Sequence, residues 1–326
     1  MTSPVWIISD GKTGIRSQIR GVAEAVGLPY DEKQLKIRYP WKGLPPSLWW
    51  NATAAASREG DRLHAPWPSL VISGGGRSAA PAVAIRRKSK GRTFVVQIQD
   101  PKIAPHHFDL MIVPQHDRAR GPNVVVTEGA VHPVTPERLA RAAAEWAPRL
   151  AHLPHPRVAV LIGGNNGVYT LSAEAMVRIA DQLAALAHAG AGLMITPSRR
   201  TGAEAEAVLR EKLAGTNAEI WDGTGENPYF GYLALADHIL ATVDSISMIT
   251  EASTTEKPIH LLALEGGSKK FDRFHKGVAE AGFTRPFDGT LREWSYRRHD
   301  DTAQAGERIR RMMQERGLWP EGYSTK

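Results

Sequence analysis

The chain has 326 residues, of which 42% are hydrophobic and 23% charged, and it carries a formal net charge of +7 and no cysteine. The absence of cysteine excludes disulfides, thiolate catalysis and cysteine-ligated zinc. No apolar run approaches the ~20 residues of a membrane-spanning helix, and the start MTSPVWIIS lacks the features of a secretory signal, so we expect a cytoplasmic protein.

Short apolar runs alternate with helical patterns along almost the whole chain. The runs are VWIIS, SLVIS, TFVVQI, DLMIV and NVVVT before residue 130, and RVAVLIG, GLMIT, HILAT and PIHLLAL after residue 156. They are continuous rather than alternating, as in parallel strands that are buried on both faces. Between them lie helical patterns such as 172–188, where the apolar residues form one stripe. This alternation predicts an α/β fold with helices on both faces of each sheet.

The segment between the two groups of runs predicts a domain boundary. It has prolines at both ends and a helical pattern between them, and the chain length suggests about two domains. We predict a first Rossmann-like domain over 1–133, a linker helix within 134–156, a second Rossmann-like domain over 157–300, and a terminal helix within 301–326 that could cross back to the first domain. Two such domains facing each other would form a central cleft, a common place for a ligand.

In open parallel sheets, ligands bind beyond the carboxyl ends of the strands. In the first domain these positions hold the loops DGKTGIRSQ and GGGRSAAPA, whose glycines and amide groups suit an anion or a sugar hydroxyl. The first loop has the spacing of neither a P-loop nor a dinucleotide fingerprint, and for both loops a purely structural role is an equal alternative. We treat this set as acceptor-side loop residues: Gly11, Lys12, Thr13, Gly14, Gln18, Gly75, Gly76 and Arg77.

Two carboxylates follow strands of the first domain and are candidates for a general base. Asp10 comes directly after VWIIS, and Asp100 comes after TFVVQI in the loop QDPKIAPHHFD. A carboxylate in such a position can accept a proton from an attacking hydroxyl. His106 and His107 in the same loop are weaker candidates, because most histidines lie on the surface without a catalytic role.

The strand ends of the second domain carry a set that suits a nucleotide diphosphate. Paired arginines match its oxygens, small hydroxyls at a helix start can cap the helix or bind phosphate, and a carboxylate one turn later could accept both ribose hydroxyls. Helix capping and core packing are the competing explanations. The set is Gly164, Asn165, Ser198, Arg199, Arg200, Asn227, Pro228, Tyr229, Asp244, Ser245, Ser247 and Glu251.

Two further stretches bear on partners. RRKSKGR (Arg86 to Arg92) is a solvated helix end or a site for an anionic membrane surface. YPWKGLPPSLWW is rich in tryptophan, which favours membrane interfaces, although internal packing explains it equally well. No nucleic-acid-binding motif accompanies the positive charge, so we expect no nucleic-acid partner.

Seven stretches together resemble the ELM ("elongated mitochondria") family over nearly the full length of the chain. They are DGKTGIRSQ, SGGGRSAAPA, QIQDP, TPSRRT, ENPYFGYLALAD, DSISMITEA and KKFDRFH. The family in turn is similar to GT-B glycosyltransferases, which have two Rossmann-like domains. The resemblance implies that Glu251 binds the donor ribose, that Ser245, Ser247 and the Met248 backbone bind the diphosphate, and that Arg200 clamps it. It also implies that no catalytic metal or other cofactor is needed.

We therefore expect a GT-B-type transferase that binds a nucleotide-diphosphate sugar in the interdomain cleft and transfers the sugar to an acceptor of unknown identity. A lipid-linked acceptor at the inner face of the membrane is one candidate. The alternative is a non-catalytic scaffold at a membrane surface, because plant members of the family are associated with the recruitment of a division protein. A short-chain epimerase is excluded, since that class needs a GxGxxG loop and a Tyr-x-x-x-Lys pair.

Overall fold

The computed structural model describes residues 3–56, 59–297 and 300–324, and the chain divides into two compact units. The first unit is Met1–Pro133 with Asp300–Lys326, and the second is Val134–His299. Each contains a six-stranded sheet in which all neighbouring strands are parallel. The class of fold is therefore α/β with parallel sheets, as the sequence predicts.

The sheet of the first unit has the strand order β2-β1-β3-β4-β5-β6. The strands are β1 (Val5–Ser9), β2 (Tyr30–Gln34), β3 (Leu70–Gly74), β4 (Phe94–Ile98), β5 (Leu110–Pro114) and β6 (Val124–Thr127). The helices are α1 (Thr13–Val26), α2 (Gly76–Lys88) and α9 (Asp301–Glu315), with short 3-10 helices η1 (Trp41–Gly43), η2 (Pro46–Leu48), η3 (Ala52–Ala55) and η4 (Pro105–His107).

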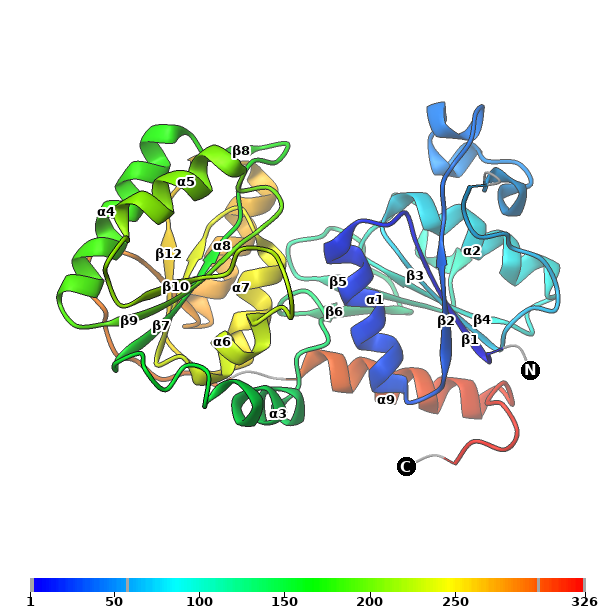
Figure 1. Ribbon diagram of the computed structural model, residues 1–326. Helices are drawn as coiled ribbons and strands as arrows, with labels where there is room; N and C mark the ends of the chain where they lie inside the picture. Colours follow the sequence, from blue (N-terminus) through cyan, green and yellow to red (C-terminus); the bar gives the residue numbers. More distant parts are fainter. Residues whose placement is uncertain (1–2, 57–58, 298–299, 325–326) are drawn as a thin grey trace. The chain divides into compact units, whose positions relative to one another are not determined.

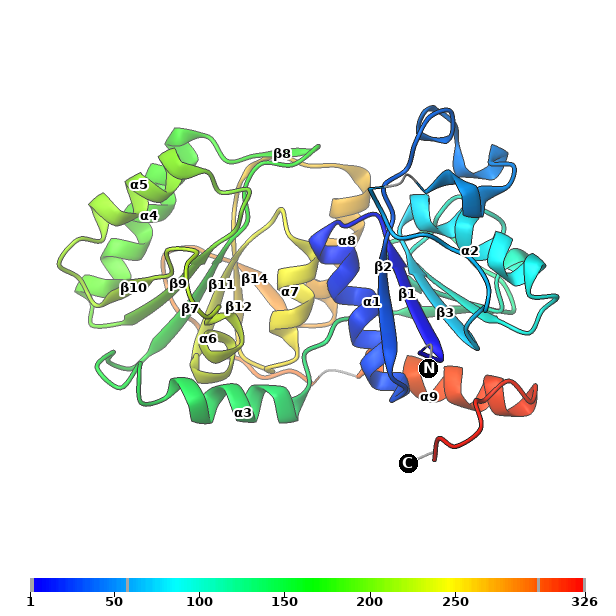
Figure 2. The ribbon, with the colours of Figure 1, turned by 45° about the vertical axis from the view of Figure 1, so that its right-hand side comes forward.

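Both faces of this sheet are buried, which explains the continuous apolar runs. Val5 and Ile7 of β1 pack with α1 and α9 on one face, and Trp6 and Ile8 pack with α2 on the other. Helix α9 lies beside α1 (Figures 1 and 2), although almost the whole chain separates them in sequence. Helix α1 ends at Gly27, whose φ of 82° is a left-handed conformation that glycine adopts without strain.

The sheet of the second unit has the order β10-β9-β7-β11-β12-β14. The strands are β7 (Arg157–Ile162), β9 (Gly192–Pro197), β10 (Ala218–Ile220), β11 (His238–Thr242), β12 (Ile259–Leu262) and β14 (Thr284–Pro286), and a small antiparallel pair is formed by β8 (Tyr169–Thr170) and β13 (Glu265–Gly266). The helices are α3 (Pro136–Trp146), α4 (Ala173–His188), α5 (Ala203–Lys212), α6 (Tyr229–Leu235), α7 (Ile246–Ser253) and α8 (Lys269–Glu280).

Two hydrophobic clusters cover the two faces of this second sheet. Helices α4 and α5 pack on one face, while α3, α6, α7 and α8 pack on the other. The segment expected as a linker contains α3, which lies against α6 within the second unit: Trp146 meets Tyr232 edge to face with ring centroids 6.1 Å apart. A Cβ on Gly231 would come within 2.4 Å of the Trp146 ring, so the close approach requires glycine.

The strand order of each unit reverses once, and the reversal decides where a ligand can bind. In the first unit the chain runs outward from β1 to β2 and then continues on the other side from β3, so the switch lies between β1 and β3. In the second unit the chain runs from β7 to β9 and β10 before it returns to β11, so the switch lies between β7 and β11. Ligands of doubly wound sheets bind at such switch points, outside the carboxyl ends of the strands.

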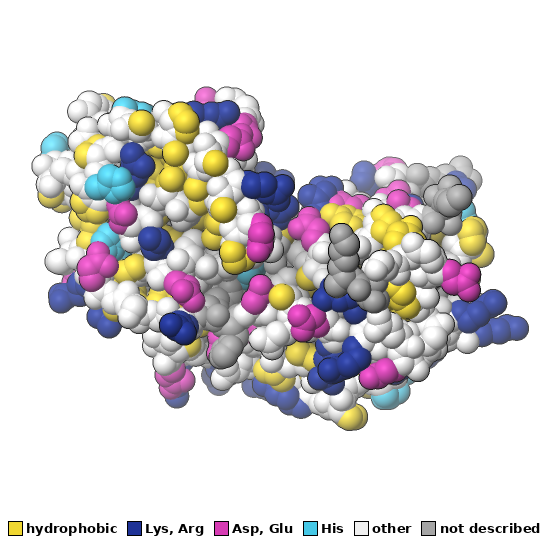
Figure 3. Space-filling model, turned by 90° about the horizontal axis from the view of Figure 1, so that it is seen from below, with side chains coloured by type: hydrophobic (Ala, Val, Ile, Leu, Met, Phe, Trp, Pro, Cys, Tyr) yellow, Lys and Arg dark blue, Asp and Glu magenta, His cyan; other side chains and the backbone are white. Residues whose placement is uncertain are grey.

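The face drawn in Figure 3 carries Lys and Arg side chains interspersed with Asp and Glu, rather than one basic stripe. Within the described residues, no helix is long and apolar enough to cross a bilayer.

Candidate functional site

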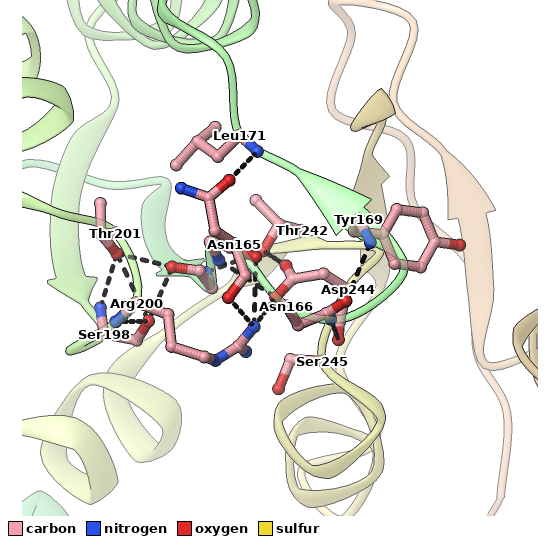
Figure 4. A network of polar contacts seen from close by, with 12 residues as sticks. Asn165, Asn166, Tyr169, Leu171, Ser198, Arg200, Thr201, Thr242, Asp244 and Ser245 are labelled. Atoms are coloured by element: carbon pink, nitrogen blue, oxygen red, sulfur yellow. Dashed lines mark hydrogen bonds and ion pairs between the residues drawn. The ribbon is translucent and has the colours of Figure 1, made fainter. Parts of the chain in front are cut away.

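Three loops meet at the carboxyl edge of the second sheet. They follow the neighbouring strands β9, β7 and β11, and they carry the Arg199–Arg200 pair, the Gly163–Gly164 turn and the start of α7 (Figure 4). The structure thus brings together Gly164, Asn165, Ser198, Arg200, Asp244 and Ser245 from the set that the sequence predicts. The turn after β7 and the loop after β11 lie at the switch point.

Asp244 is the centre of this network. Its carboxylate is fully buried and accepts hydrogen bonds from the Gly164 amide (3.0 Å) and the Thr242 hydroxyl (2.6 Å), and its Oδ2 lies 2.6 Å from Nη1 of Arg200. Thr242 in turn accepts a hydrogen bond from the Gly163 amide at 2.8 Å. Because every contact is to the loops themselves, Asp244 positions the loops and does not face a ligand directly.

The turn after β7 has no room for side chains. A Cβ on Gly163 would lie 2.2 Å from the Asp244 carboxylate, and one on Gly164 would lie 2.1 Å from the Arg200 carbonyl oxygen. Gly164 also has a φ of 145°, which other residues rarely adopt. The two glycines therefore allow the three loops to touch.

Arg200 is held by its Nη1 alone. Besides Asp244, this atom donates to the carbonyl oxygens of Gly164 (3.1 Å) and Asn165 (3.5 Å). The Nε and Nη2 donors bond to no residue that the structure describes, and 37% of the side chain is exposed. Arg200 is thus fixed at one end and keeps donors for an anion, which a guanidinium binds in a forked geometry.

The loop after β9 is locked by two hydroxyls. The Ser198 and Thr201 hydroxyls each donate to the Gly163 carbonyl oxygen at 2.6 Å. Ser198 Oγ also accepts from the Arg200 amide at 3.1 Å, so it fixes the backbone that carries the arginine. Arg199 lies next to Arg200 in this loop.

Helix α7 starts at this edge and is capped from within. The Ser245 hydroxyl accepts a hydrogen bond from the Met248 amide at 3.4 Å, as an N-cap serine does. Ser247 lies in the first turn of the helix. The Met248 amide, expected as a donor to a diphosphate, thus already has an acceptor, while the helix start still offers positive charge to an anion.

Glu251 lies near Tyr229, whose hydroxyl is buried without a hydrogen-bond partner among the described residues. Glu251 lies in α7 and is 8% exposed, and Tyr229 is the first residue of α6. Burial, followed by the Glu251 carboxylate, raises the pKa of the Tyr229 hydroxyl well above its ordinary value. Asn227 accepts a hydrogen bond from the Tyr229 amide (3.0 Å), and Pro228 is the N-cap residue of α6, so both shape the start of that helix.

The loops of the first unit also lie at a switch point, after β1 and β3. Asp10 follows β1; its Oδ1 is buried without a hydrogen-bond partner among the described residues, and its Oδ2 lies 3.7 Å from Lys12 Nζ. Gly75 has a φ of 77° and precedes α2, whose first turn carries the exposed Arg77. Gln18 is buried and accepts from Gln99 Nε2 at 3.1 Å, so it supports the loop from inside.

Asp100, the other expected base, already has partners for both carboxylate oxygens within its own turn. Its carboxylate accepts from the Lys102 amide at 2.8 Å and pairs with the Lys102 ammonium at 2.7 Å. The turn includes two non-glycine residues with positive φ, Gln99 at 66° and Lys102 at 61°. Between the two carboxylates, Asp10 is the one with an unsatisfied oxygen.

Four residues that are not in the predicted set also hold the site together. Thr242, Thr201, Asn166 and His275 all contact the site loops: Asn166 Nδ2 donates to the Asp244 carbonyl oxygen (3.2 Å), and His275 Nε2 lies 2.9 Å from the Val243 carbonyl oxygen. His275 belongs to the stretch KKFDRFH, and that was the only signal for it. Among the described residues, no group of three or more His, Asp or Glu side chains is placed to hold a metal ion.

Comparison with known proteins places the chain in a family. The model of the family "Mitochondrial fission ELM1" matches residues 13–313. The chain belongs to this family. Mitochondrial fission protein ELM1 of Arabidopsis thaliana is 34% identical in an alignment of 278 positions that covers 77% of this chain. The chain spans about two thirds of that protein, since the match covers 65% of its length.

Solved structures resemble the chain in fold. The UDP-GlcNAc 2-epimerase of Methanocaldococcus jannaschii matches with a TM-score of 0.56 at 12% identity, over 95% of this chain and 99% of the enzyme. Its complex with UDP-GlcNAc and UDP matches with a TM-score of 0.51. The spinosyn forosaminyltransferase SpnP matches with a TM-score of 0.50 at 14% identity, over 97% and 95% of the two chains. At these identities the likeness shows the fold alone, which is GT-B-like.

Proposed function

We propose that the second unit binds the nucleoside diphosphate of a nucleotide sugar at the carboxyl ends of β7, β9 and β11, and that the chain transfers the sugar to an acceptor hydroxyl. The observation that carries the proposal is Arg200, which Asp244 holds at the switch point with two donors left over. The start of α7 lies beside it in the network and adds partial positive charge. Together they suit the two phosphates of such a ligand.

The neighbouring structures support the choice of ligand class. One is of an epimerase with UDP-GlcNAc and UDP, and another is of a glycosyltransferase. By analogy of fold we take a UDP-sugar as the first donor to test. Glu251 would accept the ribose hydroxyls, and the buried Tyr229 hydroxyl lies near its carboxylate.

In the proposed reaction, the acceptor oxygen forms a bond to the anomeric carbon while the bond from that carbon to the β-phosphate oxygen breaks. Arg200 and the helix start stabilise the charge that develops on the leaving diphosphate. The proton of the acceptor hydroxyl passes to a carboxylate; of the two candidates, Asp10 has an oxygen without a hydrogen-bond partner among the described residues, whereas Asp100 is paired with Lys102. The acceptor is proposed to be linked to a lipid, with the protein at the cytoplasmic face of a membrane.

Two substitutions test the nucleotide site. Arg200→Lys keeps a cation beside Asp244 but removes the forked donors, so it should weaken UDP binding while leaving the weaker binding of uridine unchanged. Glu251→Ala should weaken both ligands by ~1–3 kcal/mol, because both contain ribose. Calorimetry that finds equal loss for UDP and uridine in Arg200→Lys would remove Arg200 from the diphosphate site.

A non-catalytic scaffold is the second proposal, and two observations favour it. The description of the family refers to mitochondrial fission rather than to an enzymatic activity. In addition, the Asp100 carboxylate is paired with the Lys102 ammonium, so it is not free to act as a base. Nucleotide binding without turnover of any sugar donor would support the scaffold. The epimerases among the similar structures suggest a third reaction to assay, isomerisation of the UDP-sugar. The missing GxGxxG and Tyr-x-x-x-Lys motifs exclude a short-chain epimerase, but they do not bear on epimerases of this GT-B-like fold.

A further inference from the structure

Two separate sequence signals meet in one pocket of the first unit. The tryptophan-rich stretch and the basic end of α2 line the same cavity of about 390 Å³, through Trp49 and Trp50 on one side and Arg87 and Lys88 on the other. The loop after β4 closes it with Lys102, Ile103 and His107. Solvation of a helix end and internal packing each explain one stretch alone, but they do not explain why the two stretches line one cavity.

The charge of this pocket has one sign. Four of its lining residues carry or can gain positive charge, and no carboxylate is among the described residues that line it. Lys88 binds Asn51 Oδ1 and Thr53 Oγ1 at 3.1 and 2.6 Å, and Lys102 pairs with Asp100 just outside the lining. The exposed side chain of Arg87 makes no hydrogen bond or ion pair with any described residue, so its guanidinium is available to an anion.

The lowered pKa of His107 is consistent with the same excess of positive charge. Burial lowers its pKa, and the neighbouring His106, Arg87 and Arg86 lower it further. Arg86 is balanced by Asp109 at 2.9 Å, whereas Arg87 has no such partner in the described part of the chain. An anion seated beside Arg87 would relieve this repulsion.

The tryptophan-rich stretch that lines the pocket presents apolar side chains to solvent. Trp50, which lines the pocket, is 58% exposed, and Tyr39 and Leu48 of the same stretch are 75% and 62% exposed. The segment that carries them is held from within, because the indole N–H groups of Trp41 and Trp49 donate to the carbonyl oxygens of Trp50 (2.8 Å) and Leu44 (2.9 Å). The stretch therefore combines exposed apolar side chains with the basic residues that line the pocket, a combination typical of membrane interfaces.

We propose that this pocket binds the phosphate of an anionic phospholipid, and that Tyr39, Leu48 and Trp50 enter the interface around it. Arg87 and Lys102 meet the phosphate, and Trp49 and Ile103 cover the glycerol and the first part of the acyl chains. The first unit is thereby anchored to an anionic membrane. This site is separate from the nucleotide site of the second unit, and it does not depend on transferase activity.

The test is co-sedimentation of the full chain with vesicles of phosphatidylcholine alone or mixed with phosphatidylserine. Binding is expected only to the anionic vesicles. Arg87→Glu, which reverses one charge in the pocket, should weaken it by about tenfold or more, and Trp50→Ser should weaken it as well. Arg178→Glu makes the same charge change on the exposed surface of α4, outside the pocket, and should have little effect. Thermal melts check that each variant is folded.

Three outcomes would overturn the proposal. The first is the absence of binding to anionic vesicles. The second is an equal loss in Arg87→Glu and Arg178→Glu, which would show attraction by net charge without a pocket. The third is binding of soluble glycerol phosphate that equals vesicle binding and competes with it, which would make the pocket a site for a small anion.

Discussion

Replacing Asp244 by Asn tests the network that builds the nucleotide site. The side chain keeps its shape but loses its charge, and the amide nitrogen cannot accept a hydrogen bond. Since the two carboxylate oxygens accept from Gly164, Thr242 and Arg200, at least one of these donors loses its acceptor in either orientation of the amide. We expect the free energy of unfolding to fall by about 2 kcal/mol. Breaking a buried ion pair costs about 3–5 kcal/mol, and the partial exposure of Arg200 to solvent reduces this cost.

For a domain of this size, that loss lowers the melting temperature by about 4–8 °C in a calorimetric scan. Asp181→Asn is the matched control in the same unit, because Asp181 pairs with Lys212 at 2.8 Å with both side chains largely exposed. Breaking such a surface pair costs about 0–1 kcal/mol. If Asp244→Asn melts no lower than Asp181→Asn, the carboxylate does not hold the loops and the account of the site is wrong.

Two other substitutions probe the second unit. Gly164→Ala should destabilise it by about 3 kcal/mol or more, because the new Cβ would clash with the Arg200 carbonyl oxygen, whereas Gly167→Ala has open space and should be silent in the same melt. Burial, followed by the charge of His238, lowers the pKa of His260 to about 4. As the pH falls from 6.5 toward 4, His260 is therefore protonated in the unfolded chain but not in the folded one, and the free energy of unfolding should decrease over that window. In His260→Gln, the melting temperature should fall less between pH 7 and pH 5 than in His188→Gln, which replaces an exposed histidine. An equal fall in the two variants would contradict this prediction.

The sequence predicts the central strands well and most of the edge strands poorly. All nine apolar runs contain strands: eight are inner strands, where burial on both faces demands continuous apolar residues, and the ninth is the partly exposed edge strand β6. The edge strand β2 reads YDEKQ and is only partly buried, and the edge strands β10 and β14 have three residues each. Such strands are held by backbone pairing with a neighbour, and no local pattern reveals them.

The site is predictable in its parts but not in its connections. Glycine, serine and arginine after apolar runs mark strand ends, so Gly164, Ser198, Arg200 and Ser245 could be found. Which loops become neighbours depends on the strand order, and the sequence alone does not give it. The role of Thr242 is not evident from the sequence because this residue ends an apolar strand, and no local pattern shows that Tyr229 and Glu251, on two different helices, come near each other.

The most direct test of the central claim is a thermal-shift measurement on the wild-type chain with UDP, GDP and ADP, their common sugar conjugates, and the free nucleosides. A ligand at about 100 times its Kd stabilises the fold by ~2.7 kcal/mol, or about 5–10 °C for a domain of this size. The account predicts a shift with one family of nucleoside diphosphates and a much smaller shift with the matching nucleoside. A folded protein whose melting temperature no nucleotide changes would contradict it.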